Sequence, residues 1–170
     1  MAVLATIGGL SLLAGATLAA VVSVQAYRKH VPGKESLGYI VNWADLGDSV
    51  KITEVVHSYS SERNWVSGDR LNFYCLRLDK PLADLDRRTP ETDTWVHAPV
   101  SDRLLLEAIK TATTFSRNGA PWFPEEGILN SRRFFLSFPQ VTAYHGRVEA
   151  VDLTAYDTQE HLLYHAEVRW

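Results

Sequence analysis

The sequence predicts an α+β protein, with an N-terminal transmembrane helix followed by a two-layer domain of a largely antiparallel sheet packed on one main helix. Three observations support this prediction. Residues 2–26 carry no charged side chain, residues 101–118 have apolar side chains at helical spacing, and most other apolar stretches are rich in β-branched and aromatic residues. We expect an anchor at 1–27, a basic juxtamembrane linker at 28–36 and one folded domain at 37–170.

The uncharged stretch Ala2–Ala26 is long enough to cross a bilayer. Coiled as a helix, its 25 residues extend about 37 Å, which exceeds the ~30 Å thickness of the hydrocarbon region. A cleaved signal peptide is the alternative, because Val24-Gln25-Ala26 fits a small-residue cleavage site. We favour the anchor, since no Lys or Arg precedes the stretch and its length exceeds the roughly 7–15 residues of a signal-peptide core.

The basic residues predict the orientation of this anchor. All Lys and Arg residues follow the uncharged stretch, and such residues stay preferentially on the cytoplasmic side of a membrane or on the matrix side of a mitochondrial one. We therefore expect a single-pass protein of a bacterial or mitochondrial inner membrane, with its domain on that side. Arg28, Lys29 and Lys34 are expected to contact anionic lipid headgroups, unless the first two simply end the span.

Small residues recur every four positions in the same stretch, at Ser11, Gly15, Ala19 and Ser23. This spacing lets two helix backbones approach closely in a membrane, so it predicts a face for helix packing. More than half of the stretch is Gly, Ala, Ser or Thr, however, and chance alone produces such a stripe in that composition.

The first part of the domain is typical of strands. Leu37–Trp43, Val50–Ser60 and Arg70–Leu78 are rich in β-branched and aromatic residues, which favours three strands. Asp79–Thr94 is charged and rich in turn-forming residues, so we expect a long surface connection there.

The main helix is predicted at Ser101–Asn118. Ser101 is expected to cap it, and Asn118-Gly119 supplies a stop. Its apolar stripe has to be buried against the sheet, and consists of Leu105, Ala108, Ile109, Ala112 and Phe115.

The C-terminal part predicts a run of antiparallel strands with turns at His145-Gly146 and at residues 157–159. The strands are expected at Arg133–Phe138, Gln140–Tyr144, Arg147–Tyr156 and Leu162–Trp170. The last one alternates cleanly, with Leu163, His165, Glu167 and Arg169 on one face, so it predicts one covered face and one face open to water.

No residue pattern indicates catalysis, a metal or a cofactor. His161 and His165 have the spacing of helical metal ligands, but the alternation places them in or beside a strand. Cys75 lies in an apolar strand, where a thiol is usually inert. The net charge of −3 and the pI of about 6.1 argue against a nucleic-acid partner.

Two aromatic loops are candidates for binding a partner protein. Residues 60–70 place Trp65 between Arg63 and Arg70, and residues 120–127 present Trp122 and Phe123 between two prolines. Trp, Tyr and Arg dominate interface energies when a partner buries them. The alternative is that the aromatic side chains fold back onto the core of the domain itself.

These patterns together predict a single-pass, membrane-anchored accessory or structural subunit of a larger membrane protein complex, with other subunits and the bilayer as its partners. An exported or membrane-tethered domain that binds a small ligand in the concave face of its sheet is the alternative. An enzyme would need His57, His145 or Cys75 beside a carboxylate in the folded chain.

Overall fold

A computed structural model of the protein describes residues 32–46, 50–61, 70–82, 85 and 95–170. The chain divides into two units, Met1–Pro32 and Gly33–Trp170, and all helices and strands named below belong to the second. The predicted anchor at 1–27 lies outside the described residues. Within them, no helix is both long and apolar enough to span a membrane.

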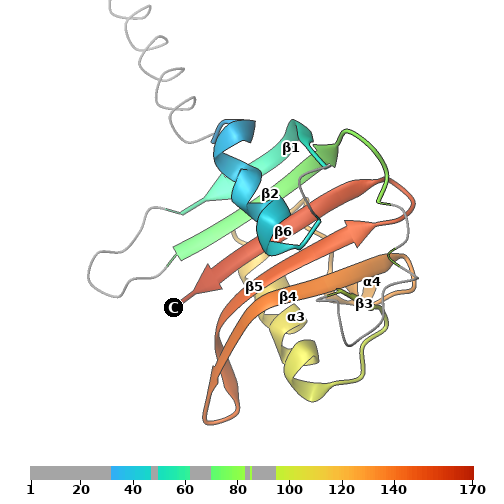
Figure 1. The fold of residues 1–170 in the computed structure, drawn as a ribbon. Coiled ribbons are helices and arrows are strands. Elements are labelled where there is room, and N and C mark those ends of the chain that lie inside the picture. Colours follow the sequence, from blue (N-terminus) through green and yellow to red (C-terminus); the bar gives the residue numbers. More distant parts are fainter. Residues whose placement is uncertain (1–31, 47–49, 62–69, 83–84, 86–94) are drawn as a thin grey trace, which may run out of the picture. The chain divides into compact units, whose positions relative to one another are not determined.

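Six antiparallel strands of the described chain form one sheet, in the order β1-β2-β6-β5-β4-β3 (Figure 1). This confirms the predicted antiparallel sheet. The strands are β1 (Ile52–Ser60), β2 (Arg70–Leu78), β3 (Trp95–His97), β4 (Phe134–Tyr144), β5 (Arg147–Asp157) and β6 (Leu162–Arg169). β2 has the bounds that the sequence predicted.

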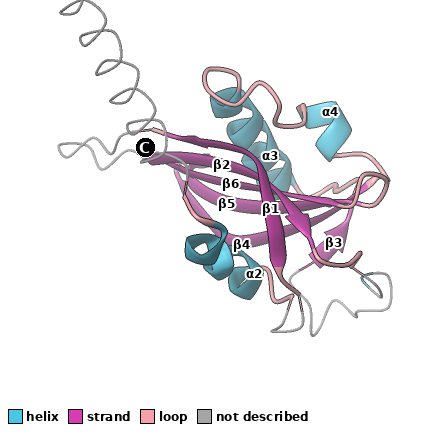
Figure 2. Ribbon diagram, turned by 90° about the horizontal axis from the view of Figure 1, so that it is seen from above, coloured by secondary structure: helices cyan, strands magenta, loops and turns pink. Residues whose placement is uncertain are grey.

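Helical segments cover both faces of this sheet (Figure 2). The main helix α3 (Arg103–Ser116) and the short helix α4 (Glu126–Leu129) lie on one face. The 3-10 turn η1 (Lys34–Leu37) and helix α2 (Gly38–Trp43) lie on the other. The α+β class is correct, but the prediction of two layers is wrong, because α2 adds a third.

The prediction of a strand at Leu37–Trp43 is therefore wrong as well. Leu37, Ile40, Val41 and Ala44 are all buried, and their spacing is that of one helix face. β-Branched and aromatic content favoured a strand, but burying these four side chains together on the sheet requires a helix. They pack in a core with Tyr74 and several residues of the same sheet face.

The predicted main helix is confirmed, although its cap differs. Asp102, and not Ser101, is the N-cap residue, because its Oδ1 accepts hydrogen bonds from the backbone N–H groups of Leu104 and Leu105 at 2.9 and 3.1 Å. The predicted stripe faces the sheet, where Ala108, Ile109 and Ala112 are buried. These three residues belong to the larger of the two described core clusters, with apolar residues of β2, β4, β5 and β6.

The two strands predicted around Pro139 form the single strand β4. An irregularity in its pairing with β5, between Ser137 and Gln140, accommodates the proline, as a β-bulge does. The predicted turn at His145-Gly146 is confirmed, and both residues have positive φ angles, 49° and 77°. Two such residues are characteristic of a tight hairpin turn.

The prediction of a water-exposed face on the last strand is wrong. Leu163, His165 and Glu167 are buried, because η1 and α2 cover much of the sheet face on which they lie. Trp95 of β3 holds the C-terminal end of α2, since its Nε1 donates a hydrogen bond to the Ala44 carbonyl at 2.6 Å.

Replacing Gly119 with alanine is expected to lower the free energy of unfolding by about 1–3 kcal/mol, through overpacking. A Cβ at Gly119 would lie 2.1 Å from the ring of Tyr59, which packs against the α3-side core. Urea unfolding followed by tryptophan fluorescence measures the effect. Gly127→Ala is the control, because its Cβ would meet no atom within 4 Å. A penalty for Gly119→Ala that persists in a Tyr59→Ala background would contradict this assignment.

Candidate functional site

The structure separates the predicted partner-binding residues of the two aromatic loops. Arg63 and Trp65 lie outside the described residues. Phe123 is only 4% exposed, and its ring centroid lies 5.2 Å from that of Phe73 in the α3-side core. A partner cannot reach the Phe123 side chain while the loop keeps this conformation.

The side chain of Trp122 packs against edge strand β1. Its ring stacks on that of His57, with 5.2 Å between centroids and an interplanar angle of 23°. The side chain of Trp122 is half-buried, and His57 is exposed. β1 pairs only with β2 in the described sheet, so the Trp122–His57 pair adjoins a strand whose outer edge has no described neighbour. An edge of this kind is a common place for a partner strand to add.

Arg70 belongs to a charged cluster on the α2 side of the sheet, which we call the polar cluster. Its members lie on four adjacent strands and are Ser60, Arg70, Asn72, Asp152, Glu167 and Arg169. The register pairs Asn72 with Glu167, and Glu167 with Asp152. Two carboxylates and two guanidinium groups balance in charge, while the arginine side chains remain 48% and 40% exposed.

Hydrogen bonds connect one half of the polar cluster tightly. Ser60 Oγ donates to Asn72 Oδ1 at 2.6 Å, and Asn72 Nδ2 donates to Glu167 Oε2 at 2.7 Å. The arginines lie further away: Arg70 Nε is 3.5 Å from Glu167 Oε2, and Arg169 Nη2 is 3.4 Å from Asp152 Oδ2. These distances exceed the 2.7–2.9 Å usual for charge-assisted bonds, so the arginines neutralise the two carboxylates only weakly. The shorter Ser60–Asn72–Glu167 hydrogen bonds join β1 to the inner strands.

Asp152 is one of two members of the polar cluster with a buried atom that lacks a hydrogen-bond partner in the described structure; the other is Arg169, through its Nε. In Asp152 this atom is Oδ1. Burial raises the pKa of the Asp152 carboxyl, and the charge of Arg169 opposes that rise. The carboxyl therefore has a weaker acidity than an exposed aspartate.

His165 lies fully buried beside the polar cluster, beneath α2. Its Nδ1 is 3.0 Å from Thr154 Oγ1, and its ring lies near those of Tyr39 and Tyr74. Burial lowers the pKa of His165 to about 3, so the imidazole is neutral at physiological pH.

The remaining titratable candidates lie apart from one another. Cys75 is buried, and burial raises the pKa of its thiol to about 11, which disfavours the nucleophilic thiolate. His161 Nδ1 lies 3.0 Å from the Tyr156 hydroxyl, in the turn before β6. His145 contacts Tyr144 beside the hairpin turn. Within the described part of the chain, no group of three or more His, Cys, Asp or Glu residues is placed to hold a metal ion.

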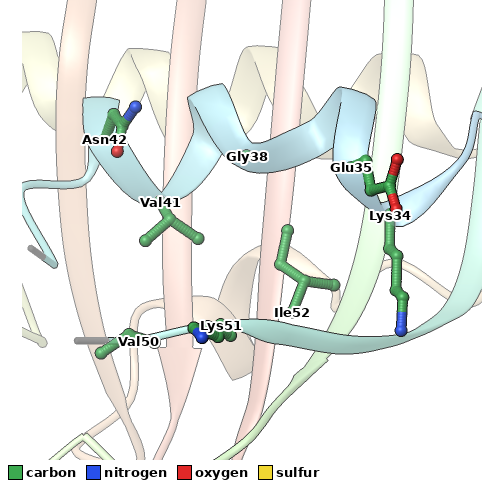
Figure 3. Close-up of a pocket in the computed structure, with 8 residues that line it drawn as sticks. All are labelled: Lys34, Glu35, Gly38, Val41, Asn42, Val50, Lys51 and Ile52. Carbon is green, nitrogen blue, oxygen red and sulfur yellow. The ribbon is translucent and has the colours of Figure 1, made fainter. Parts of the chain in front are cut away.

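A cavity of about 430 Å³ lies between the η1–α2 segment and the beginning of β1 (Figure 3). Val41 points from the helix toward the strand, and Ile52 points from the strand toward the helix. Lys34 lies at one end and Lys51 on the strand side. The other lining residues are Glu35, Gly38, Asn42 and Val50. Lys34, predicted to contact lipid headgroups, thus lines a cavity together with a second cation.

The other predicted membrane-facing residues are outside the described part of the chain. These are Ser11, Gly15, Ala19 and Ser23 of the packing stripe, together with Arg28 and Lys29. Their roles stay predictions.

No family model, curated protein or solved structure matches the chain. The residues and their geometry are therefore the basis for assigning a function.

The sequence pattern did not reveal the cavity or most of the polar cluster. Helical spacing of Leu37, Ile40 and Val41 was the signal that could have revealed the helix above the cavity. The alternation in β6 already placed Glu167 and Arg169 on one face, but nothing local showed that α2 would bury Glu167 there.

His165→Gln is expected to reduce the loss of stability on acidification between about pH 6.5 and pH 4.5. An unfolded imidazole binds a proton near its ordinary pKa of 6.5, whereas burial lowers the pKa of the folded one to about 3. Folding therefore releases a proton between these values, and the stability of the native protein falls as the pH is lowered. One such group contributes at most about 1.4 kcal/mol per pH unit.

Urea unfolding at several pH values measures this slope. His97→Gln, which makes the same exchange at an exposed histidine on β3, is the matched control. Equal slopes for the native protein and His165→Gln would contradict the buried, neutral imidazole.

Proposed function

We propose that the protein is a single-pass, membrane-anchored accessory subunit of a larger membrane protein complex, with its domain on the cytoplasmic or matrix side. The observation that carries this proposal is the stretch Ala2–Ala26, which lacks any charged side chain and is followed at once by Arg28 and Lys29. A stretch of that length matches the hydrocarbon thickness, and the cations after it match the usual orientation.

The construction of the domain supports a role in assembly. Helices cover both faces of the sheet, and the face beneath α3 is filled by a core that includes Phe73, Ile109 and Leu153. Burial also keeps the Cys75 thiol and the His165 imidazole in their neutral forms. The core between α3 and the sheet leaves the alternative, a small ligand held in the concave face of the sheet, little room there.

Edge strand β1 and Trp122 are the docking surface that we assign to the domain. β1 is nine residues long and pairs on one side only within the described sheet. Trp122 and His57 place two stacked rings beside it, and aromatic side chains next to a free edge provide both apolar area and strand-pairing groups. Arg70, half exposed at the beginning of β2, lies on the opposite face of the sheet, in the polar cluster, and is not part of this surface.

The anchor leads to a first prediction of fractionation. The native protein should stay in the membrane pellet after alkaline carbonate extraction, and mass spectrometry should find Ala2–Ala26 retained. Leu10→Arg/Leu13→Arg should release it, because a charge near the bilayer centre costs about 3 kcal/mol per residue. Leu10→Ala/Leu13→Ala is the matched control. A soluble native chain that begins at Tyr27 would show export and refute the anchor.

The docking surface predicts a loss of complex in the Trp122→Ala variant. Truncating an interface tryptophan costs more than about 1 kcal/mol, which corresponds to at least a fivefold weaker association. Native electrophoresis and affinity purification in mild detergent measure the share of chain found in the complex. Ile128→Ala is the control, because Ile128 is an exposed apolar residue on the same connection.

Thermal unfolding of both variants accompanies this experiment, since Trp122→Ala also removes the stack on His57. A native chain that migrates alone in mild detergent would refute the proposed assembly. Undiminished association of a folded Trp122→Ala variant would refute this docking surface.

A further inference from the structure

The cavity beneath η1 and α2 joins an apolar interior to two cationic groups. Val41, Val50 and Ile52 line it, and Lys34 and Lys51 supply the charge. In Figure 3 the Lys34 side chain extends from η1 toward β1, while the carboxylate of Glu35 stays beside the helical segment. The cavity therefore combines a rim of two cations and one carboxylate with an apolar wall.

The position of Lys34 in the chain limits how far this cavity can lie from the membrane if Ala2–Ala26 spans the bilayer. Lys34 follows Ala26 by eight residues, and an extended chain covers at most about 3.5 Å per residue. Lys34 can therefore lie no further than about 28 Å from the end of such a span. We therefore consider a membrane lipid as the ligand of this cavity.

We propose that this cavity binds one anionic phospholipid, with the phosphate at Lys34, Lys51 as a second cation of the rim, and the glycerol region against Val41, Val50 and Ile52. The inference rests on the proposed anchor for its source of ligand. Lysine ammonium groups bind phosphate as point charges, and a neighbouring apolar wall favours an esterified phosphate over the free ion. Asn42 also lines the cavity, at the other end of the helical segment from Lys34.

The volume of the cavity sets how much of the lipid it holds. Small-molecule sites are commonly about 300–1,000 Å³, and the cavity of about 430 Å³ is within that range. That volume suits a phosphate, a glycerol and the first methylenes better than two complete acyl chains.

Gly38 offers a way to fill the cavity without disturbing the fold. It lies on the cavity wall at the beginning of α2, and a Cβ there would meet no atom within 4 Å. Its φ of −55° is helical, so a side chain can be added without backbone strain. Gly127 of α4 is the matched control, because its Cβ also meets open space but on the other side of the sheet.

The test uses the full chain in mild non-ionic detergent, titrated with dihexanoylphosphatidylglycerol and followed by native mass spectrometry. One bound molecule is expected, at least tenfold tighter than dihexanoylphosphatidylcholine or glycerol 3-phosphate. Lys34→Gln/Lys51→Gln should weaken binding at least tenfold. Arg103→Gln/Lys110→Gln, which removes two cations from α3, should leave it unchanged.

Filling the cavity gives an independent result. Gly38→Leu should abolish binding and leave the melting temperature equal or higher, while Gly127→Leu binds as the native chain does. Equal affinity for the two lipids, glycerol 3-phosphate that binds as tightly as the lipid, or unchanged binding by Gly38→Leu would each overturn the proposal.

Failure of the anchor has a different signature, because the titration does not depend on how the chain is held in the cell. A carbonate-extractable chain that still prefers the anionic lipid would refute the anchor and support the site. A retained anchor in a chain that shows no preference for the anionic lipid would support the anchor and refute the lipid site.

Discussion

Burial of β2, β6 and β5 on both faces is the constraint on which the rest of the structure depends. On the α3 side, the inner strands contribute apolar residues such as Phe73, Leu153 and Ala166 to one core. On the α2 side they carry Leu163 and Tyr156 at one end and the polar cluster at the other. A register slip by one residue would exchange these faces, so the pairing is fixed by the different demands of the two sides.

The sequence predicted the features that depend on local pattern. Strands β1 and β2, helix α3 and the tight turn at His145-Gly146 follow from β-branched content, helical spacing and turn chemistry within each segment. The prediction of a strand at Leu37–Trp43 failed because the β-branched and aromatic content favoured a strand while the spacing of the buried residues favoured a helix. Packing against the sheet stabilises the helix. The prediction that one face of β6 is open to water failed for a different reason. The helical segment that covers this face lies more than 100 residues earlier in the chain.

The candidate sites divide along the same line. Trp122 was predicted from composition, but its stacking on His57 depends on a loop after α3 that returns to β1. Phe123 has the same neighbours in the sequence and points into the core instead, so proline and aromatic content did not distinguish the two. Lys34 was predicted from its place after the anchor, whereas Lys51 required the contact of η1 with the beginning of β1.

The η1–α2 segment has a mechanical consequence if Ala2–Ala26 anchors the chain as proposed. It is the first structured segment of the domain, and it runs from the beginning of β1 to Ala44, where Trp95 of β3 holds it. A force on the N-terminal end would therefore act first on the η1–α2 segment, which lies across several strands. It would not act first on an edge strand, whose hydrogen bonds could break one at a time. Lateral drag from the tether would be resisted in shear, with the load shared by the strands beneath.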